Sequence, residues 1–320
     1  MNQTSEKTPL VSTIVPAMNE QGNIDEFCRQ FDDMQKKASF RNEIVFVDDG
    51  STDGTIDTIK AAAGKYDFVR YAVHPRNRGI TASLETGFAM AKGEIFIYYP
   101  ADLQYKPEDI PKLIQPILDG ADICTGWKQG KYNKKFVSLV YNWFSRKLFN
   151  LKVHDLNSVK AFRKEITDRV FRKDWHRYLV VLAANEGYRI EEVKIPLYER
   201  SWGKTKFSIF RIPIGVLDML SVWFQIKFLK KPLLYFGIIG FIMFAMAFLV
   251  GLIAIYLRFV EHEGYRPLLY LVILLAGLGM GFFVMGFVLE AQTALKDEIG
   301  DLRMKLRKVL SDKNNSGGNS

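Results

Sequence analysis

Two long stretches without a charged residue constrain this chain more than any other feature of its sequence. Residues 232–257 and 267–289 contain no Asp, Glu, Lys, Arg or His. At 1.5 Å per helical residue they would extend roughly 39 and 34 Å, enough to cross a hydrocarbon layer of about 30 Å. A pair of buried core helices is the alternative, but uncharged runs of this length are rare in soluble domains. The sequence therefore predicts two transmembrane helices.

Basic residues lie outside both runs, which predicts their orientation. The short link at 258–266 carries two Arg against two Glu, so it has no basic excess. Because positive flanks favour the cytoplasmic side, we expect both termini and the N-terminal domain on the cytoplasmic face of an inner or plasma membrane. Residues 1–9 are polar and the apolar run after them is too short for a signal peptide. The flanking basic residues are Lys227, Lys230, Lys231, Arg303, Lys305, Arg307 and Lys308.

The net charge of +9 is concentrated in two segments. Residues 127–152 hold seven basic residues and no acid, and residues 200–231 hold seven more against Asp218 alone. We expect these two segments to lie nearest the bilayer, where anionic headgroups attract basic residues. The charge therefore predicts membrane contact and no nucleic acid partner. A solvated basic face is the alternative. The two cysteines, Cys28 and Cys124, have no metal-ligand spacing and are expected to be free thiols.

Residues 9–126 alternate strand-like and helical stretches, which is typical of βαβ units and a mostly parallel, Rossmann-like sheet. Residues 127–200 are interpreted as the second half of this domain, with helices at 136–149 and 178–185 and a strand at 189–195. The expected strands are 11–15, 43–47, 69–73, 94–98 and 122–125. The expected helices are 23–37, 55–63, 81–92 and 107–118.

Four segments follow from this pattern. Residues 1–206 form the cytoplasmic α/β domain, and residues 207–231 form amphipathic helices in the membrane interface. Residues 232–289 form the transmembrane hairpin, where Gly277 and Gly281 allow close helix approach or occur by chance. Residues 290–320 form a C-terminal helix and a disordered tail from Asn314. Apolar residues at spacings of three and four in that helix fit a short coiled coil joining subunits, or a single amphipathic helix.

Polar residues follow the expected strands at four loops, where ligands bind in open parallel sheets. The first loop is Val15-Pro-Ala-Met-Asn-Glu20. The second, Val47-Asp-Asp-Gly-Ser-Thr-Asp-Gly-Thr55, is either a turn with a helix cap or a site whose adjacent carboxylates accept from a base and a ribose.

The third and fourth loops predict phosphate and metal chemistry. His74-Pro-Arg-Asn-Arg-Gly79 places two Arg at a helix N-terminus, which suits a diphosphate. Pro100-Ala-Asp-Leu-Gln104 places a carboxylate and an amide oxygen beyond a strand, which suits Mg²⁺ or Mn²⁺ held mainly by the phosphates of a substrate.

The ordered set of motifs resembles the inverting family 2 glycosyltransferases with the GT-A fold. The motifs 16–20, 47–55, 77–79 and 101–104 carry that resemblance. Two later motifs, Asp155-Leu-Asn-Ser-Val-Lys-Ala-Phe-Arg163 and Arg200-Ser-Trp-Gly-Lys-Thr-Lys-Phe207, are similar to those of the polyisoprenyl-phosphate branch, which includes dolichol-phosphate mannose synthases. The two C-terminal spans resemble the GtrB type of that branch.

The resemblance implies roles for individual residues. Asp155 would lie by the transferred sugar, and Lys160 would contact phosphates. Met18 stands where the family often has an aromatic residue, and Pro100 stands where it usually has Asp, so the metal motif is reduced to Asp102. The implied catalytic residues are Asp102, Asp155 and Lys160; the nucleotide-sugar ligands are Pro16, Asn19, Glu20, Asp48, Asp49, Arg78 and Ala101; the phosphate ligands are Arg200, Lys204 and Lys206; and the ligands of Mg²⁺ or Mn²⁺ are Asp102 and Gln104.

The implied reaction is transfer of a hexose, with inversion, from a nucleotide-sugar to a polyisoprenyl phosphate at the bilayer. UDP-glucose and undecaprenyl phosphate are the expected substrates, and GDP-mannose is the alternative donor. A lipid phosphate is mostly dianionic at neutral pH, so no general base is required. A homo-oligomer is expected.

Three rival functions stay open on the sequence. A processive polysaccharide synthase would need a QxxRW segment and more spans. A transferase acting on a lipid alcohol would need a base, for which Asp155 is the candidate. A membrane subunit that binds nucleotide-sugar without turnover is favoured only by Pro100.

Overall fold

The computed structural model describes residues 11–130, 135–171, 176–200, 202, 211–228, 230–262 and 264–316. Within these ranges, residues 135–141, 211–213, 297, 300, 301 and 303–316 are described by their backbone alone. The chain divides into two compact units, residues 1–219 and 220–320, which are described separately below. The boundaries predicted at 206 and 231 stay predictions.

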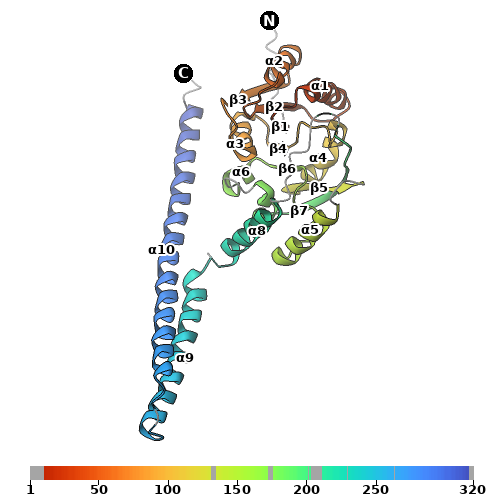
Figure 1. Cartoon of the computed structure of the whole chain (residues 1–320). Helices are drawn as coiled ribbons and strands as arrows, with labels where there is room; N and C mark the ends of the chain where they lie inside the picture. Colours follow the sequence, from red (N-terminus) through yellow and green to blue (C-terminus); the bar gives the residue numbers. More distant parts are fainter. Residues whose placement is uncertain are drawn as a thin grey trace. The chain divides into compact units, whose positions relative to one another are not determined.

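A seven-stranded, mostly parallel sheet forms the centre of the first unit (Figure 1). Its strand order is β3-β2-β1-β4-β6-β5-β7, and β6 alone runs antiparallel to its neighbours β4 and β5 among the described strands. The α/β class and the five strands predicted in residues 9–126 are confirmed. The strands are β1 Val11–Ala17, β2 Asn42–Asp48, β3 Val69–Val73, β4 Ile95–Tyr98, β5 Ile123–Gln129, β6 Lys160–Arg163 and β7 Ile190–Pro196.

Helices cover both faces of the sheet. Apolar side chains of α1, α2 and α4 join strand residues such as Phe46 and Ile97 in one continuous buried cluster. On the other face, α3 packs so closely that a Cβ on Gly87 would lie 2.4 Å from Ile14. Phe88 of α3 stacks on Phe96 with ring centroids 5.6 Å apart. The first-unit helices are α1 Gln21–Gln35, α2 Thr55–Lys65, α3 Ile80–Met90, η1 Pro107–Asp109, α4 Ile110–Leu118, α5 Lys135–Phe149, α6 Glu165–Arg169, η2 His176–Tyr178 and α7 Leu179–Asn185.

Strand β6 was not predicted, because it is only four residues long and begins and ends with a basic residue. Its antiparallel direction matters for the site. Lys160 pairs in register with Tyr98 at the carboxyl end of β4. An antiparallel strand therefore brings its amino end, and the loop before it, to the edge where the parallel strands end.

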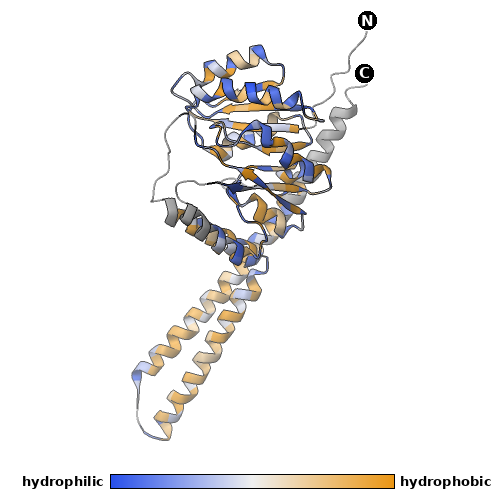
Figure 2. Cartoon of the chain, turned by 90° about the vertical axis from the view of Figure 1, so that its right-hand side faces the viewer, coloured by the Kyte–Doolittle hydropathy of each residue, from blue (hydrophilic) through white to orange (hydrophobic). Residues whose placement is uncertain are grey.

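Two long apolar helices make up most of the second unit. Helix α9 (Pro232–Phe259) and residues 266–296 of α10 (Arg266–Ser316) each contain a strongly apolar stretch of at least 18 residues. Figure 2 shows hydrophobic colouring along both. By length and composition both can cross a membrane, as the sequence predicted. Their pairing includes a hydrogen bond from the Leu233 N–H to Glu290 Oε2 at 3.2 Å, which caps the N-terminus of α9.

The closest approach between α9 and α10 differs from the predicted pair of glycines. A Cβ on Gly277 or Gly281 would meet nothing within 4 Å. A Cβ on Gly240 would lie 2.7 Å from the carbonyl oxygen of Gly279, and one on Gly279 would lie 3.0 Å from that of Gly240. Gly240 and Gly279 therefore allow the backbones to meet, and the packing expectation for Gly277 and Gly281 is wrong for these two helices.

Two further features bear on the sequence predictions. Helix α8 (Arg211–Lys227) falls in the expected interfacial segment and exposes Ile214 and Leu217. Helix α10 continues through Ser316, so residues 314–316 belong to the helix rather than to a tail.

Cys28 and Cys124 are buried free thiols, as predicted, and burial raises the pKa of each to about 12.

Candidate active site

The carboxyl ends of the parallel strands and the amino end of β6 meet at one edge of the sheet. In register, Ala17 of β1 pairs with Asp48 of β2, and Ile14 lies beside Tyr98 of β4. Strands β5 and β7 run parallel to each other, so the chain after Pro196 leaves from the same edge. All four polar loops, the loop before β6 and residues 197–202 are thereby gathered at this edge, where open parallel sheets bind ligands.

The first and second loops are tied together by hydrogen bonds that involve two predicted nucleotide ligands, Asn19 and Glu20. The Asn19 N–H donates to Ser51 Oγ at 3.0 Å, and Asn19 Oδ1 accepts from the Thr52 N–H at 2.8 Å. Asn19 has a φ of 56°, a conformation that Asn tolerates better than most residues. The Glu20 N–H donates to Thr55 Oγ1 at 2.9 Å. Asn19 and Glu20 therefore shape the two loops. Pro16, the other predicted ligand here, is half-buried on β1.

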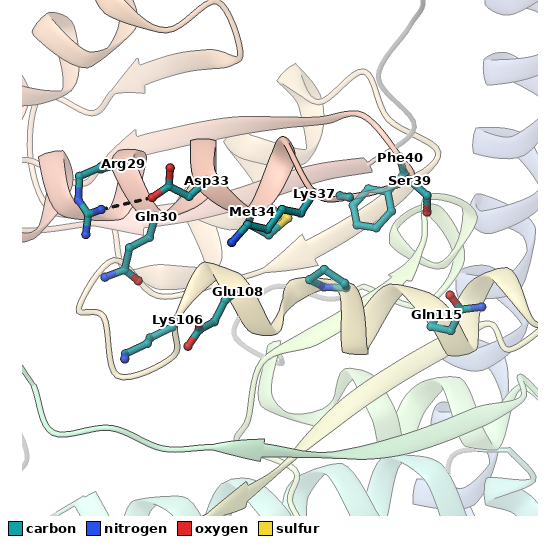
Figure 3. A pocket seen from close by; sticks show the side chains of 12 residues that line it. Arg29, Gln30, Asp33, Met34, Lys37, Ser39, Phe40, Lys106, Glu108 and Gln115 are labelled. Atoms are coloured by element: carbon teal, nitrogen blue, oxygen red, sulfur yellow. Dashed lines mark hydrogen bonds and ion pairs between the residues drawn. The ribbon is translucent and has the colours of Figure 1, made fainter.

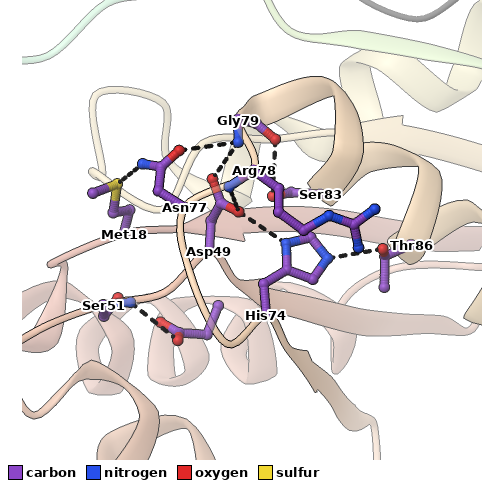
Figure 4. A network of polar contacts seen from close by, with 10 residues as sticks. Met18, Asp49, Ser51, His74, Asn77, Arg78, Gly79, Ser83 and Thr86 are labelled. Carbon is purple, nitrogen blue, oxygen red and sulfur yellow. Dashed lines mark hydrogen bonds and ion pairs between the residues drawn. The ribbon is translucent and has the colours of Figure 1, made fainter.

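The adjacent carboxylates of Asp48 and Asp49 have different surroundings, and Figure 4 shows those of Asp49. Asp49 accepts from His74 Nδ1 at 2.8 Å and from the N–H groups of Arg78 and Gly79 at 2.9 Å each. Burial opposes ionisation of Asp49, but these hydrogen bonds outweigh it and hold its pKa below the ordinary value. Both oxygens of Asp49 thus fasten the third loop.

Asp48 retains an unused acceptor. Its Oδ2 accepts from the Ser51 N–H at 3.2 Å, whereas its buried Oδ1 has no hydrogen-bond partner within the described residues. A buried acceptor without a partner is costly unless a ligand or water satisfies it. Of the two predicted nucleotide ligands, Asp48 is the one with an oxygen left to accept from a base or ribose.

The third loop is built around the His74 ring. His74 Nε2 lies 2.9 Å from Thr86 Oγ1, so the buried imidazole connects Asp49 to α3. A Cβ on Gly50, whose φ is 73°, would lie 2.5 Å from the backbone of Arg76, so only glycine lets the second loop approach the third. Arg78 is exposed and leaves from a backbone anchored to Asp49, which suits contact with a diphosphate.

The fourth loop presents Asp102, which is 7% exposed. Leu103 has a φ of 56°, an uncommon conformation for a branched residue, and the Gln104 N–H donates to Asp102 Oδ1 at 3.2 Å. Asp102 Oδ2 forms an ion pair with the Arg200 guanidinium at 2.6 Å. Ala101 is buried behind the carboxylate-bearing turn. A predicted metal ligand and a predicted phosphate ligand, 98 residues apart, thus contact each other.

The loop before β6 places Asp155 in the same region. Lys128 of β5 lies 3.2 Å from Asp155 Oδ2, and the Asn157 N–H donates to Oδ1 at 2.9 Å. Glu192 of β7 accepts from the backbone N–H groups of His154 and Asp155 at 2.7 and 3.1 Å, which holds this loop against the sheet. Asp155 is therefore an oriented, buried carboxylate with one cationic partner.

Lys160 lies inside the site rather than at its surface. It is 2% exposed and its Nζ donates to the Ser158 carbonyl oxygen at 2.8 Å. Burial lowers its pKa to about 7, against the opposing effect of Asp155. Burial also lowers the pKa of the neighbouring His176 to about 3, so this imidazole is neutral at physiological pH. The predicted phosphate contact of Lys160 stays a prediction.

Residues 197–200 contact the fourth loop, and Trp202 contacts α1. The Tyr198 N–H donates to the Gln104 carbonyl oxygen at 2.9 Å, and Lys106 Nζ lies 4.2 Å from the centre of the Tyr198 ring. Trp202 packs on the N-terminal turn of α1, where a Cβ on Gly22 would lie 2.6 Å from its indole. We name residues 197–200 together with Trp202 the strap. Lys204 and Lys206, the other predicted phosphate ligands, lie outside the described residues.

Several site residues were not singled out from the sequence. Lys128 was grouped with the basic residues expected at the bilayer, yet only 15% of its side chain is exposed. Tyr105 hydrogen-bonds to Ser158 at 3.2 Å; burial raises the pKa of its hydroxyl, and the charges of Asp155 and Asp102 act in the same direction. The strand predicted at 122–125 continues through Gln129, so Lys128 lies on β5. Its position shortly after the predicted strand was the one signal for it in the sequence. Tyr105 had no signal, because a tyrosine near a loop is ordinary.

A cavity of about 540 Å³ lies away from these residues (Figure 3). It is an open groove between α1 and the η1–α4 segment, lined among others by Arg29, Lys37 and Glu108. None of the predicted site residues lines it. The chemistry expected from the sequence therefore does not involve this groove.

The donor set fits a divalent cation that is held mainly by a substrate. No cluster of three or more His, Cys, Asp or Glu with metal-site geometry occurs among the described residues, so a cage made by the protein alone is not seen there. Mg²⁺ is commonly bound through one or two carboxylates together with substrate phosphates and waters. Asp102 supplies one such carboxylate, and its contact with Arg200 shows that this position accommodates positive charge.

Comparison with known proteins supports the same chemistry. The family model described as glycosyl transferase family 2 matches residues 12–180. The dodecaprenyl-phosphate galacturonate synthase of Rhizobium johnstonii is 28% identical over 302 residues, which cover 90% of this chain and 89% of that protein. The undecaprenyl-phosphate 4-deoxy-4-formamido-L-arabinose transferase of Pseudomonas fluorescens is 30% identical over 261 residues, covering 78% and 74%.

A solved structure shares the fold. The glucosyl-3-phosphoglycerate synthase of Mycobacterium tuberculosis, crystallised with Mn²⁺, UDP and glucosyl-3-phosphoglycerate, superposes with a TM-score of 0.54. The match covers 68% of this chain and 80% of that one, at 16% identity. At this identity the likeness concerns the fold alone. Together with the family match it confirms the GT-A fold expected from the motifs.

Proposed function

Because this chain belongs to glycosyl transferase family 2, we propose that it transfers one sugar from a nucleotide-sugar to a polyisoprenyl phosphate. Family membership confirms the prediction of a glycosyltransferase. The acceptor is proposed from the names of the two curated relatives, which both act on polyisoprenyl phosphates, and from the two helices that are long enough to span a membrane.

One observation carries the proposal most directly. Asp48, Asp102 and Asp155 come from three separate loops, yet the fold brings them to one edge of the sheet beside the cations of Lys128 and Arg200. This arrangement suits a substrate with a base, a diphosphate and a sugar in line. Asp48 would accept from the nucleoside, Arg78 would bind the diphosphate, and Asp155 would bind the sugar.

In the proposed reaction, a phosphate oxygen of the lipid attacks the anomeric carbon of the sugar. The new bond joins that oxygen to the anomeric carbon, and the bond from the anomeric carbon to the nucleoside diphosphate breaks. The phosphate is already mostly dianionic at neutral pH, so no proton has to be removed. A single displacement inverts the configuration and gives a β-linked product from an α-linked donor.

The protein's part in this reaction is alignment and charge stabilisation. Asp102 and Gln104 would hold Mg²⁺ or Mn²⁺, which when bound would neutralise charge on the leaving diphosphate. Arg200, with Lys204 and Lys206, would bind the lipid phosphate. We place the reaction at the cytoplasmic face of the membrane, with both termini on that side, and expect a homo-oligomer.

The donor that we propose is UDP-glucose with undecaprenyl phosphate as acceptor, on the likeness of the two C-terminal spans to the GtrB type. A second candidate sugar is galacturonate, because a relative that is similar over 90% of the chain carries that sugar in its name. GDP-mannose is the remaining alternative donor from the sequence.

The test is a transfer assay with the full-length protein in detergent or lipid nanodiscs. Labelled UDP-glucose, UDP-galacturonate and GDP-mannose are offered with undecaprenyl phosphate, and the lipid product is analysed for its anomeric configuration. We expect a β-linked lipid-phosphate sugar, and loss of product with Asp102→Asn. An α-linked product would exclude single displacement, and the absence of any lipid-linked sugar with every donor would exclude the proposed function.

A further inference from the structure

The ion pair between Asp102 and Arg200 occupies the carboxylate that the proposed function assigns to a cation. The guanidinium lies 2.6 Å from Asp102 Oδ2. The Asp102 side chain is 10% exposed and the Arg200 side chain is 26% exposed. Charge-assisted hydrogen bonds at such a distance are among the stronger polar contacts in proteins. We propose that Arg200 and a divalent cation compete for Asp102, so that Arg200 closes the cation site whenever no cation is bound. This inference rests on the proposed function only for the role of Asp102 as cation ligand.

The strap holds Arg200 in this position from both sides. Before Arg200, the Tyr198 N–H is bonded to the Gln104 carbonyl oxygen, and the Tyr198 ring lies under Lys106. After Arg200, Trp202 packs against Gly22 of α1. Because the backbone is anchored on the same loop that carries Asp102, the guanidinium is directed at the carboxylate with little loss of backbone freedom.

The positive charges of Arg200 and of a divalent cation prevent both from binding Asp102 at the same time. Asp102 is the one carboxylate in the 100–104 motif, which begins with Pro100. Its Oδ1 already accepts from the Gln104 N–H, which leaves Oδ2 as the oxygen that Arg200 occupies. A dication and a guanidinium a few ångströms apart repel strongly, and one carboxylate compensates only part of their charge. Binding of the cation therefore requires the guanidinium to leave.

Release of Arg200 has a consequence for the acceptor. A guanidinium that no longer contacts Asp102 can direct those N–H groups to phosphate oxygens, the ligand proposed for it above. Loading of the cation would then expose the acceptor-binding arginine, and a site without cation would keep it covered. The alternative is a permanent structural ion pair, which the following experiment distinguishes.

The first test measures Mn²⁺ binding to the full-length protein in nanodiscs at a fixed concentration of UDP and without lipid phosphate, by electron paramagnetic resonance of free Mn²⁺, with protein-free UDP as the blank. Arg200→Gln should raise the affinity for Mn²⁺ by roughly tenfold or more, since a charge-assisted hydrogen bond no longer has to be broken. The control Arg189→Gln removes an equal charge from a surface pair with Glu191 and should leave the affinity unchanged. Asp102→Asn should abolish binding in either background.

The second test needs no variant. Phenylglyoxal modifies accessible arginines, and mass spectrometry reports the rate at each position. In the presence of UDP, added Mn²⁺ should increase the modification rate of Arg200 severalfold over UDP alone in the unaltered protein, while the rate at the exposed Arg189 stays constant as an internal reference.

The outcomes separate this inference from the proposed function. Equal Mn²⁺ affinity in Arg200→Gln and the unaltered protein, or an unchanged rate of Arg200 modification, would show a structural ion pair and overturn the inference. The transfer assay is independent, since neither binding measurement involves a sugar. Competition for Asp102 in a protein that transfers no sugar would leave the inference standing and remove the proposed function.

Discussion

Lys128 and Asp155 form an ion pair of 3.2 Å that is almost completely withdrawn from solvent. Lys128 lies near the end of β5 and Asp155 in the loop before β6, so the pair joins two parts of the chain that leave the sheet at the same edge. Removing one member of a buried pair leaves the other charge uncompensated. Lys128 is thus expected to hold the Asp155 carboxylate in its orientation.

We predict that Lys128→Met lowers kcat/KM for sugar transfer by roughly tenfold to a hundredfold, because Asp155 loses the cation that fixes it. Nucleotide affinity should change little. The exposed Lys60 of α2 provides the control Lys60→Met, which should be neutral. Steady-state kinetics with separate measurement of UDP binding checks this, and an unchanged kcat/KM would show that the pair is dispensable.

Asp49→Ala is predicted to destabilise the first unit by about 3 kcal/mol at pH 7, because it removes an acceptor of three hydrogen bonds, one of them from a buried imidazole. The pKa of Asp49 is lowered in the folded protein, so this contribution is present above the unfolded pKa and is lost as the pH falls through the folded pKa. The difference from the unaltered protein should therefore shrink in acid. Thermal unfolding in detergent at pH 7 and pH 3 measures it, with the exposed Asp67→Ala as control.

Lys160 predicts a pH dependence of the same sign as that of Asp49, but in the alkaline range. Its pKa is lowered from 10.5 to about 7, so between these values the unfolded chain binds more protons than the folded one. Stability contributed by this position therefore rises with pH across that window. Relative to Lys160→Met, the unaltered protein should gain unfolding free energy from pH 7 to pH 10, a trend that Lys60→Met should not show. A flat difference across this range would place the pKa of Lys160 near its ordinary value.

The contact between Gly22 and Trp202 predicts a rescue. Gly22→Val should displace the strap, since any Cβ at this position would overlap the indole, and transfer should fall at least severalfold. In a Trp202→Ala background the same substitution should have little further effect, because its clash is gone. Activity of the two single variants and the double variant forms the thermodynamic cycle. Additive losses would mean that Gly22 acts independently of the strap.

The membrane hairpin offers a matched pair of glycines. Gly240→Leu should separate α9 from α10 and destabilise their packing by about 1 to 3 kcal/mol, because its side chain meets the Gly279 backbone. Gly277→Leu, on the same hairpin but with open space around its Cβ, should be tolerated. Unfolding in mild detergent compares the two. Equal effects would contradict the close approach at Gly240.

Much of the architecture follows from local patterns. The uncharged runs predict α9 and the apolar part of α10 because backbone polar groups in hydrocarbon require a helix. The alternation of strands and helices up to residue 126 predicts the parallel sheet, since each period buries one face. The polar residues after Val15, Val47 and Tyr98 predict a site, because parallel strands end at one edge.

Tertiary structure decided what each of these polar residues does. The sequence does not reveal that both oxygens of Asp49 accept hydrogen bonds from His74 and the third loop. It also does not reveal that Oδ1 of the neighbouring Asp48 has no hydrogen-bond partner within the described residues. Nor does it reveal that Lys128 faces Asp155, or that Arg200 folds back over 98 residues onto Asp102. Strand β6 was too short to have a pattern of its own. Composition and periodicity report which residues are buried or exposed, but partners in an ion pair are set by the packing of loops from distant strands, which only the folded chain brings together.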